Sequence, residues 1–180
     1  MSALGPTSDA TPDRLSALTD TMYAQIRSIA ERIFSSERAG HTLQPTAVVN
    51  EACLRLMSRG LPELPRDQQL ALAARVLKQV LIDHARAHRA DKRGGGAVCL
   101  QVTDDVMDPA TTAVEFDSIH SALERLRALS ERQAEVVTLR IFAGMEMQQI
   151  ADVLGVSKRS AEGDWTVARV WLRRELTQNL

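Results

Sequence analysis

The stretch MQQIADVLGVSKRSAEGDW, residues Met147–Trp165, predicts two helices separated by a short turn. Its first part places apolar residues on one helical face, Gly155 marks a turn, and Ser157 is suited to cap a second helix. This order is typical of a helix-turn-helix unit, whose second helix reads DNA. A plain helical hairpin within a bundle is the alternative interpretation of the pattern, which the turn disfavours.

The second of these helices, predicted to run to about Leu176, has two different faces. Apolar residues on its inner face recur at intervals of four, three and four, namely Ala161, Trp165, Ala168 and Leu172. Such a stripe packs the helix onto its neighbours, so Trp165 is expected in the core rather than stacked on a base. The face predicted to point outward carries Lys158, Arg159, Glu162 and Arg169.

The rest of the chain also predicts helices, because apolar residues recur at three- and four-residue intervals and strand signals are nearly absent. The fold class is therefore all-α. The expected helices are about Asp13–Phe34, Pro45–Met57, about Asp67–Ala90, Asp117–Ala128, and a segment from Ser130 to near Phe142. Pro45 suits a first helical position, since its missing N–H would have no partner there. Ser130 with Gln133 predicts a capping box, and Gly144 breaks the helix that follows.

The third expected helix carries most of the positive charge. Its predicted core face consists of Leu70, Ala73, Leu77, Val80 and Leu81, with the cations pointing outward. Residues 75–93 contain six basic and two acidic residues, whereas residues 101–124 contain six acidic residues and no Lys or Arg. This change from net positive to net negative charge is typical of a solvated tether between two basic faces.

These patterns predict two small helical domains joined by an acidic flexible linker, the second domain containing the helix-turn-helix. The expected divisions are a disordered tail over 1–10, a first domain over 11–96, the linker over 97–116 and a second domain over 117–178. With 180 residues and only 3% aromatic residues, two small cores are expected rather than one large enzyme core.

Several classes of protein are disfavoured. No apolar run approaches the roughly 20 residues that span a bilayer, and Cys53 and Cys99 lie far apart, which indicates a cytoplasmic, reduced protein. His84 and His88 could bind zinc with Cys99, but paired cysteine spacing is missing and a solvated basic face is favoured. The Gly94–Gly96 run lacks the strand and lysine of a phosphate loop. We therefore expect no enzyme activity, metal or cofactor.

Three segments carry a resemblance to a known family. VVNEACLRLM (48–57) is similar to the family's second-region helix, AARVLKQVLIDHARAHR (73–89) to its promoter-melting helix, and residues 126–176 to its fourth region. On these segments the chain resembles the extracytoplasmic-function (ECF) sigma factors of the sigma-70 family, the promoter-specificity subunits of bacterial RNA polymerase. The resemblance covers nearly the whole chain, and HTLQPTAVVNEACLRLM (41–57) looks like an atypical subgroup.

The resemblance implies two partners, the RNA polymerase core and promoter DNA, and no cofactor. Residues that would contact the core are Val48, Val49, Asn50, Glu51, Leu54 and Arg55. Residues placed at the single-stranded downstream element are Arg66, Arg75, Lys78, Gln79 and Arg86. Residues placed in the major groove of the upstream element are Ser157, Lys158, Arg159, Glu162 and Arg169.

The last helix departs from the family pattern at Glu162, Gly163 and Asp164, where Lys and Arg are usual. Fewer phosphates can then be neutralised, so non-specific affinity for DNA should fall. Glu162 could accept a hydrogen bond from a cytosine amino group and so read a base. Alternatively, Glu162 and Asp164 pair in solution with Lys158 and Arg169. The sequence leaves both interpretations open.

A second departure precedes the 48–57 segment, where family members carry an acidic run and this chain has QPTA, residues 44–47. Thr46 lies in the first helical turn, where a phosphate would meet free N–H groups and the positive end of the helix dipole. One hypothesis is that a Ser/Thr kinase phosphorylates Thr46, with Thr42 as a weaker candidate, in place of release from an anti-sigma factor. The alternative is that Thr46 is only a helix-start residue.

Three functions compete on the sequence. A sigma factor is preferred over a free-standing helix-turn-helix transcriptional regulator and over a helical adaptor that binds only protein. The basic 75–93 face and the fourth-region resemblance argue against the adaptor, and the 48–57 helix argues against the lone regulator.

Overall fold

The computed structural model describes residues 11–34, 45–58, 64–90, 99–101 and 113–178. Within these residues the elements are α1 (Thr11–Ile33), α2 (Pro45–Ser58), α3 (Arg66–Ala90), β1 (Cys99–Gln101), β2 (Ala113–Glu115), α4 (Phe116–Leu129), α5 (Glu131–Thr138), the π-helix η1 (Leu139–Ala143), α6 (Met147–Leu154) and α7 (Lys158–Gln178). The all-α prediction is confirmed. The predicted tail over 1–10, Thr42 and the glycine run at 94–96 lie outside the described residues.

The helix boundaries follow the local signals that predicted them. Helix α2 begins at Pro45, and the Ser130 hydroxyl caps α5 by accepting from the backbone N–H of Gln133 at 3.3 Å. One segment differs: the helix expected to continue to Phe142 changes at Leu139 into a five-residue π-helix. Gly144 ends that π-helix in the left-handed conformation with φ of 66°, which favours glycine.

Strands β1 and β2 pair in antiparallel fashion, with Leu100 opposite Val114. They lie at the two ends of the segment predicted as a flexible linker, so the expectation of a tether without regular structure is wrong at residues 99–101 and 113–115. Each strand has three residues, too few for a periodic apolar pattern to reveal it. Residues 102–112 lie outside the described residues.

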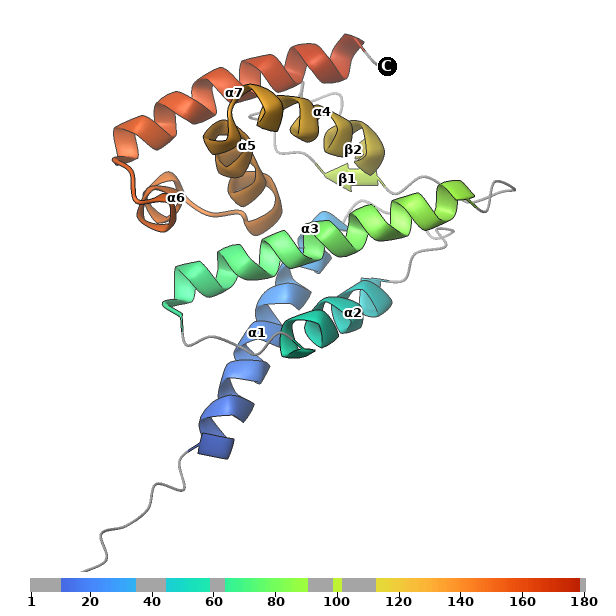
Figure 1. Ribbon diagram of the computed structural model, residues 1–180, viewed down its shortest axis with the longest axis vertical. Helices are drawn as coiled ribbons and strands as arrows, with labels where there is room; N and C mark the ends of the chain where they lie inside the picture. Colours follow the sequence, from blue (N-terminus) through green and yellow to red (C-terminus); the bar gives the residue numbers. More distant parts are fainter. Residues whose placement is uncertain (1–10, 35–44, 59–63, 91–98, 102–112, 179–180) are drawn as a thin grey trace, which may run out of the picture.

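Helix α3 lies between two groups of helices (Figure 1). Helices α1 and α2 pack on one side of it, and α4, η1 and α6 pack on another. The predicted core face is buried at Ala73, Leu77, Val80 and Leu81 and partly buried at Leu70. A second buried stripe on α3 consists of Ala71, Ala74, Lys78, Ile82 and Ala85. The helices of the two predicted domains therefore meet along α3.

The C-terminal helices form a compact group in which α7 covers α4, α5 and α6 (Figure 1). Phe116 and Phe142 meet edge to face in its core, with ring centroids 6.4 Å apart. Among the described residues, no helix is both long and apolar enough to cross a bilayer. The same residues contain no group of three or more His, Cys, Asp or Glu side chains arranged to hold a metal ion.

Candidate nucleic-acid interface

Helices α6 and α7 and the turn between them have helix-turn-helix geometry. Gly155 adopts φ of 65° at the end of α6, and its N–H reaches back to the carbonyl of Ala151. Val156 donates to the same carbonyl at 3.0 Å, so the turn is closed by backbone bonds. The hydroxyl of Ser157 accepts from the backbone N–H of Ser160 at 3.1 Å, as predicted for the cap of α7.

The buried face of α7 is the face that the sequence pattern predicted. Ala161, Trp165, Ala168 and Leu172 are all buried. Trp165 is 7% exposed and is therefore part of the core, which agrees with its expected packing role. With this stripe turned inward, the rotation of α7 about its own axis is set, and so is the set of side chains that it presents to solvent.

Asp164 was expected to be exposed, but its side chain is buried. It is 7% exposed, and its carboxylate accepts two hydrogen bonds from Arg132 of α5, at 2.6 and 3.2 Å. This bond raises the pKa of Arg132. The alternative that paired Asp164 with Arg169 in solution is wrong, because position 164 lies on the side of α7 that faces α5. Asp164 therefore links α7 to α5.

Glu162 remains on the outer side of α7. Its carboxylate lies 3.8 Å from the ammonium of Lys158, one turn earlier, and both side chains are about half exposed. The exposed residues at the start of this helix are Ser157, Lys158, Arg159, Ser160, Glu162 and Gly163. Arg169, predicted to face outward, is only partly exposed. A Cβ at Gly163 would meet no heavy atom within 4 Å, so nothing inside the protein requires glycine there.

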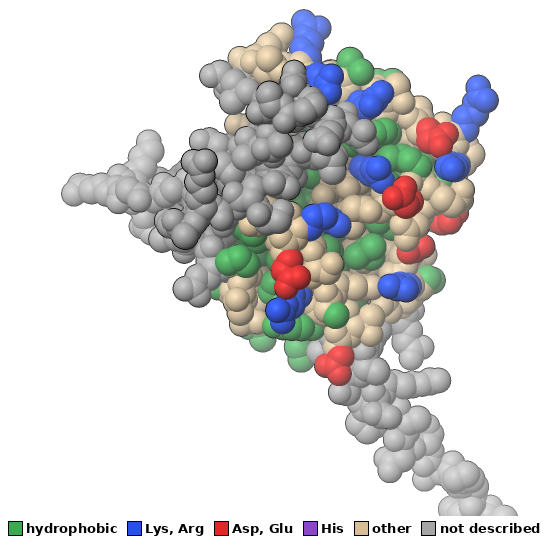
Figure 2. Space-filling view, turned by 180° about the vertical axis from the view of Figure 1, so that it is seen from behind, with side chains coloured by type: hydrophobic (Ala, Val, Ile, Leu, Met, Phe, Trp, Pro, Cys, Tyr) green, Lys and Arg blue, Asp and Glu red, His purple; other side chains and the backbone are tan. Residues whose placement is uncertain are grey.

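On the face drawn in Figure 2, the basic side chains of the described residues are not gathered in one large patch. Seen from behind, Lys and Arg side chains are spread over the surface with Asp and Glu between them (Figure 2). Sequence-independent attraction to DNA depends on the number of phosphates that cations neutralise. A mixed surface of this kind favours a protein that relies on specific contacts or on a larger assembly.

On α3 the predicted single-strand contacts differ in their accessibility. Arg66, Gln79 and Arg86 are exposed, whereas Lys78 is 7% exposed, so the expectation that Lys78 faces outward is wrong in this arrangement. Its ammonium donates to the hydroxyl of Thr138 at 3.4 Å. Burial lowers the pKa of Lys78, and the nearby Arg127 lowers it further. The exposed Arg75 is bonded to Glu135 of α5.

The predicted core-polymerase contacts on α2 also divide by exposure. Val48 and Val49 are buried against the rest of the protein, so neither side chain reaches a partner in this arrangement. Asn50 is exposed, and Leu54 is 67% exposed. Met57, three residues further along α2, is 55% exposed and was missed by the sequence analysis. The sequence did contain a signal for Met57, because Leu54 and Met57 are large apolar residues three positions apart and therefore share one face of a helix.

A polar network joins α2 to α3. Arg55 bonds both to Glu51, at 2.5 Å, and to Asp83 of α3, at 2.6 Å. His84 completes it with a 2.9 Å contact from its Nε2 to the other oxygen of Glu51. Burial raises the pKa of Asp83, but the hydrogen bonds from Arg55 and Gln79 outweigh it and hold that pKa below its usual value. In this structure Glu51 and Arg55 therefore connect α2 to α3.

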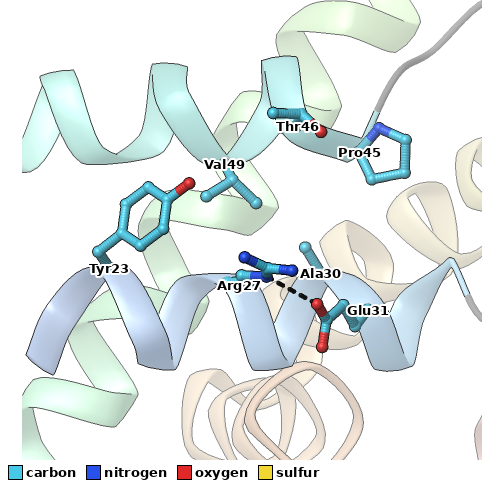
Figure 3. A pocket seen from close by; sticks show the side chains of 7 residues that line it. All are labelled: Tyr23, Arg27, Ala30, Glu31, Pro45, Thr46 and Val49. Carbon is cyan, nitrogen blue, oxygen red and sulfur yellow. Dashed lines mark hydrogen bonds and ion pairs between the residues drawn. The ribbon is translucent and has the colours of Figure 1, made fainter. Parts of the chain in front are cut away.

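Thr46 lies at the rim of a pocket of about 170 Å³ between α1 and α2 (Figure 3). Thr46 is exposed, and the first turn of α2 contains no acidic residue. Arg27 of α1 lines the same pocket and donates to Glu31 at 2.8 Å. This Arg27 was missed by the sequence analysis, because its position beside Thr46 depends on how α1 packs on α2.

Comparison with known proteins agrees with this geometry. The family model described as ECF sigma factor matches residues 8–178. A relative from Xanthomonas campestris pv. campestris named "Probable RNA polymerase sigma factor RfaY" is 29% identical over 135 residues, which make up 73% of this chain and 34% of the relative. The chain thus spans about a third of the length of that relative. No solved structure matches the chain. Because the family match extends over nearly all of its length, the chain belongs to the ECF sigma factor family.

Proposed function

We propose that this chain acts as a sigma subunit, which binds the core of bacterial RNA polymerase and directs it to particular promoters. The observation that carries the proposal is the outward face of α7, which presents Lys158 and Arg159 from a capped helix-turn-helix. That face lies in a chain that belongs to the ECF sigma factor family. The chain performs no catalytic step and needs no cofactor for this role.

The contacts with DNA divide between two helices. The start of α7, with Ser157, Lys158, Arg159 and Glu162, enters the major groove of the upstream element, and Arg169 contributes from its half-buried position. The downstream single strand is contacted by the exposed residues Arg66, Arg75, Gln79 and Arg86 of α3, whereas Lys78 is enclosed by the C-terminal helices and is not accessible to DNA in this arrangement. The core docks on the exposed side of α2, through Asn50, Leu54 and the neighbouring Met57, with Glu51 and Arg55 at its edge.

Transcription with purified core polymerase on fragmented genomic DNA, with and without the chain, tests the proposal. Initiation at defined sites only when the chain is present is the expected result. Binding of specific duplex DNA without polymerase, and no effect on initiation, would instead identify a free-standing regulator. If the chain neither binds DNA nor alters initiation, it is an adaptor and the proposal is wrong.

A finer proposal concerns the control of docking through Thr46. A phosphate there would bring about −1.5 to −2 charges to a helix start that lacks acidic residues. It would also meet Arg27 across the pocket and compete with Glu31 for that guanidinium. A Ser/Thr kinase would then act as the switch in place of an anti-sigma factor.

Core-binding and transcription assays on Thr46→Ala and Thr46→Glu test this switch, with Thr177→Ala on α7 as a control at another exposed threonine. We expect Thr46→Ala to abolish induction and Thr46→Glu to restore part of it, since Glu supplies about half the charge of a phosphate. Full induction of Thr46→Ala in cells, or no phosphate on Thr46 by mass spectrometry under inducing conditions, would contradict the proposal.

A further inference from the structure

A stripe of polar side chains on α3 runs between its two buried stripes and carries three of the residues proposed to contact the melted strand. Its members follow one another at intervals of four, four and three, and so share one side of the helix: Arg75, Gln79, Asp83 and Arg86. Asp83 is the acidic member of this set, and its negative charge would repel the DNA backbone. Attraction to phosphates therefore does not explain a carboxylate at this position.

The two oxygens of the Asp83 carboxylate bind different partners. One accepts from the guanidinium of Arg55 on α2 at 2.6 Å, and the other accepts from the side-chain amide nitrogen of Gln79 at 3.0 Å. Arg55 also donates to Glu51 at 2.5 Å. The carboxylate of Asp83 is thus anchored to a second helix, and Gln79 is bonded to an anchored group.

The charge of Asp83 determines which end of the Gln79 amide can face it. Burial raises the pKa of Asp83, but the hydrogen bonds from Arg55 and Gln79 hold that pKa below its usual value, so the carboxylate is ionised at neutral pH. An ionised carboxylate can only accept hydrogen bonds. The NH2 end of the Gln79 amide must therefore face Asp83, and its carbonyl end must point away.

The bond to Asp83 uses one N–H of Gln79 and leaves a defined pair of groups for DNA. These groups are the carbonyl oxygen, which accepts, and the second N–H, which donates. Gln79 is exposed, and its amide has no further partner among the residues that the structure describes. An acceptor beside a donor matches the amino group and neighbouring ring nitrogen of adenine, the base that glutamine binds with two hydrogen bonds. Thymine has no amino group to offer.

A second Gln–Asp pair with the same spacing lies on α6 but lacks the anchor. The amide of Gln148 donates to Asp152 at 2.9 Å, and both side chains are exposed. Among the described contacts, no Lys, Arg or His side chain bonds to Asp152. An exposed pair with no third partner stabilises a helix only slightly and leaves both side chains free to turn. The contact from Arg55 is what distinguishes the pair on α3.

We propose that Asp83 is a positioning residue, which holds the Gln79 amide with its carbonyl oxygen directed outward and so makes adenine the preferred base where Gln79 meets the melted strand. The inference rests on the proposed function, because Gln79 encounters a melted strand only in a complex with polymerase. Through Arg55, the orientation of Gln79 also depends on α2, the helix proposed to bind the core.

Selection on templates that are already melted tests the inference. Core polymerase with the full-length chain is mixed with templates whose downstream element is unpaired and randomised, and the templates that stay bound are sequenced. With the wild type we expect adenine to be enriched over thymine by about tenfold at the position that Gln79 contacts. In Asp83→Asn, whose amide can donate as well as accept, the two bases should be enriched to within about twofold of each other. Asn keeps an oxygen for Arg55, so the contact between α2 and α3 is retained.

Two further variants make the selection specific. The matched control is Asp152→Asn, which removes the same charge from the pair on α6 and should leave the base preference unchanged. Gln79→Ala identifies the position that Gln79 contacts, since the preference should disappear there and persist elsewhere. In a Gln79→Ala chain, Asp83→Asn should have no further effect on base preference, because its effect passes through Gln79. A merely structural role of Asp83 would instead lower enrichment at every position.

The possible outcomes separate this inference from the proposed function. If Gln79→Ala abolishes a preference that Asp83→Asn retains, Gln79 reads the base without Asp83 and the inference is wrong. It is equally wrong if Gln79→Ala removes no preference, if another base is preferred at that position, or if Asp83→Asn lowers enrichment at all positions alike. If the wild-type complex selects no sequence at all, the proposed function fails, and the inference fails with it.

Discussion

Helices α3 and α7 both carry proposed DNA contacts, but they are covered in opposite ways. Helix α7 lies along the edge of the C-terminal group of helices (Figure 1). It buries one stripe, and its opposite side, with Lys158, Arg159 and Glu162, faces solvent. Helix α3 buries two stripes, because one group of helices packs on each of two sides. An amphipathic pattern identifies the exposed side of a helix only when a single stripe is buried. The sequence therefore assigned the outer residues of α7 better than those of α3.

The variant with the largest expected effect on stability tests whether the buried stripe of α7 holds this helix in place. Trp165→Ala should lower the free energy of unfolding by about 3–5 kcal/mol, since Trp165 is 7% exposed and packs in the core. Val167→Ala changes a residue of the same helix that is 57% exposed, and it should alter the free energy of unfolding by less than about 0.5 kcal/mol. Urea unfolding of both variants measures the difference. A stable Trp165→Ala chain that loses only DNA binding would make Trp165 a contact residue.

On α3 the corresponding test is Lys78→Met, which keeps the volume and removes the enclosed charge. We expect the folded chain to gain about 1–2 kcal/mol at neutral pH, because the desolvation cost of the ammonium disappears. Formation of open promoter complex, followed by permanganate reactivity, should fall if Lys78 contacts the melted strand. A destabilised variant would show that Thr138 and the surrounding charges compensate the buried ammonium well.

The same variant has a defined pH dependence. Burial lowers the pKa of Lys78 in the folded chain, so between that value and the usual pKa of 10.5 the unfolded chain binds more protons. Wild-type stability should gain from Lys78 as the pH rises through this interval. The advantage of Lys78→Met should therefore be largest below the folded pKa and shrink towards 10.5. Equal stability profiles for the two proteins would contradict the lowered pKa.

Two of the acidic residues of α7, Glu162 and Asp164, allow the comparison to be made within one helix. Asp164→Asn weakens the bond to Arg132 and should lower the urea midpoint more than Glu162→Gln, whose effect should stay within about 0.5 kcal/mol. Glu162→Lys should change which upstream sequence is preferred in a binding selection. If it instead tightens binding to all sequences equally and steepens the salt dependence, Glu162 only modulates charge.

A small stabilising effect is expected at Gly163. Gly163→Ala should stabilise α7 by about 0.5–1 kcal/mol, since the added Cβ meets open space and glycine is a poor helix former. Thermal unfolding measures this gain. Promoter binding by the same variant then shows whether the backbone of α7 approaches DNA more closely than a Cβ permits. Weaker binding with raised stability would assign glycine a role in contact with DNA.

Much of the fold was predictable because its signals are local. Pro45 and Ser130 mark helix starts, and Gly144 and Gly155 mark ends through their positive φ angles. The π-helix at Leu139–Ala143 was not predictable, because this segment packs against the distant helices α1 and α3 and its carbonyls bind Arg32. The β1–β2 pair was missed for a similar reason, since neither short strand is recognisable without its partner.

The sequence by itself determined the all-helical fold, the helix-turn-helix, the inward stripe of α7 and the family. Each of these depends on spacing within a few turns, where helical geometry relates position directly to direction. Only the tertiary structure decided that Asp164 pairs with Arg132, 32 residues away, and that Lys78 meets Thr138, 60 residues away. Whether a polar side chain faces solvent or another helix depends on which distant surface covers it, and periodicity along one helix contains no information about that surface.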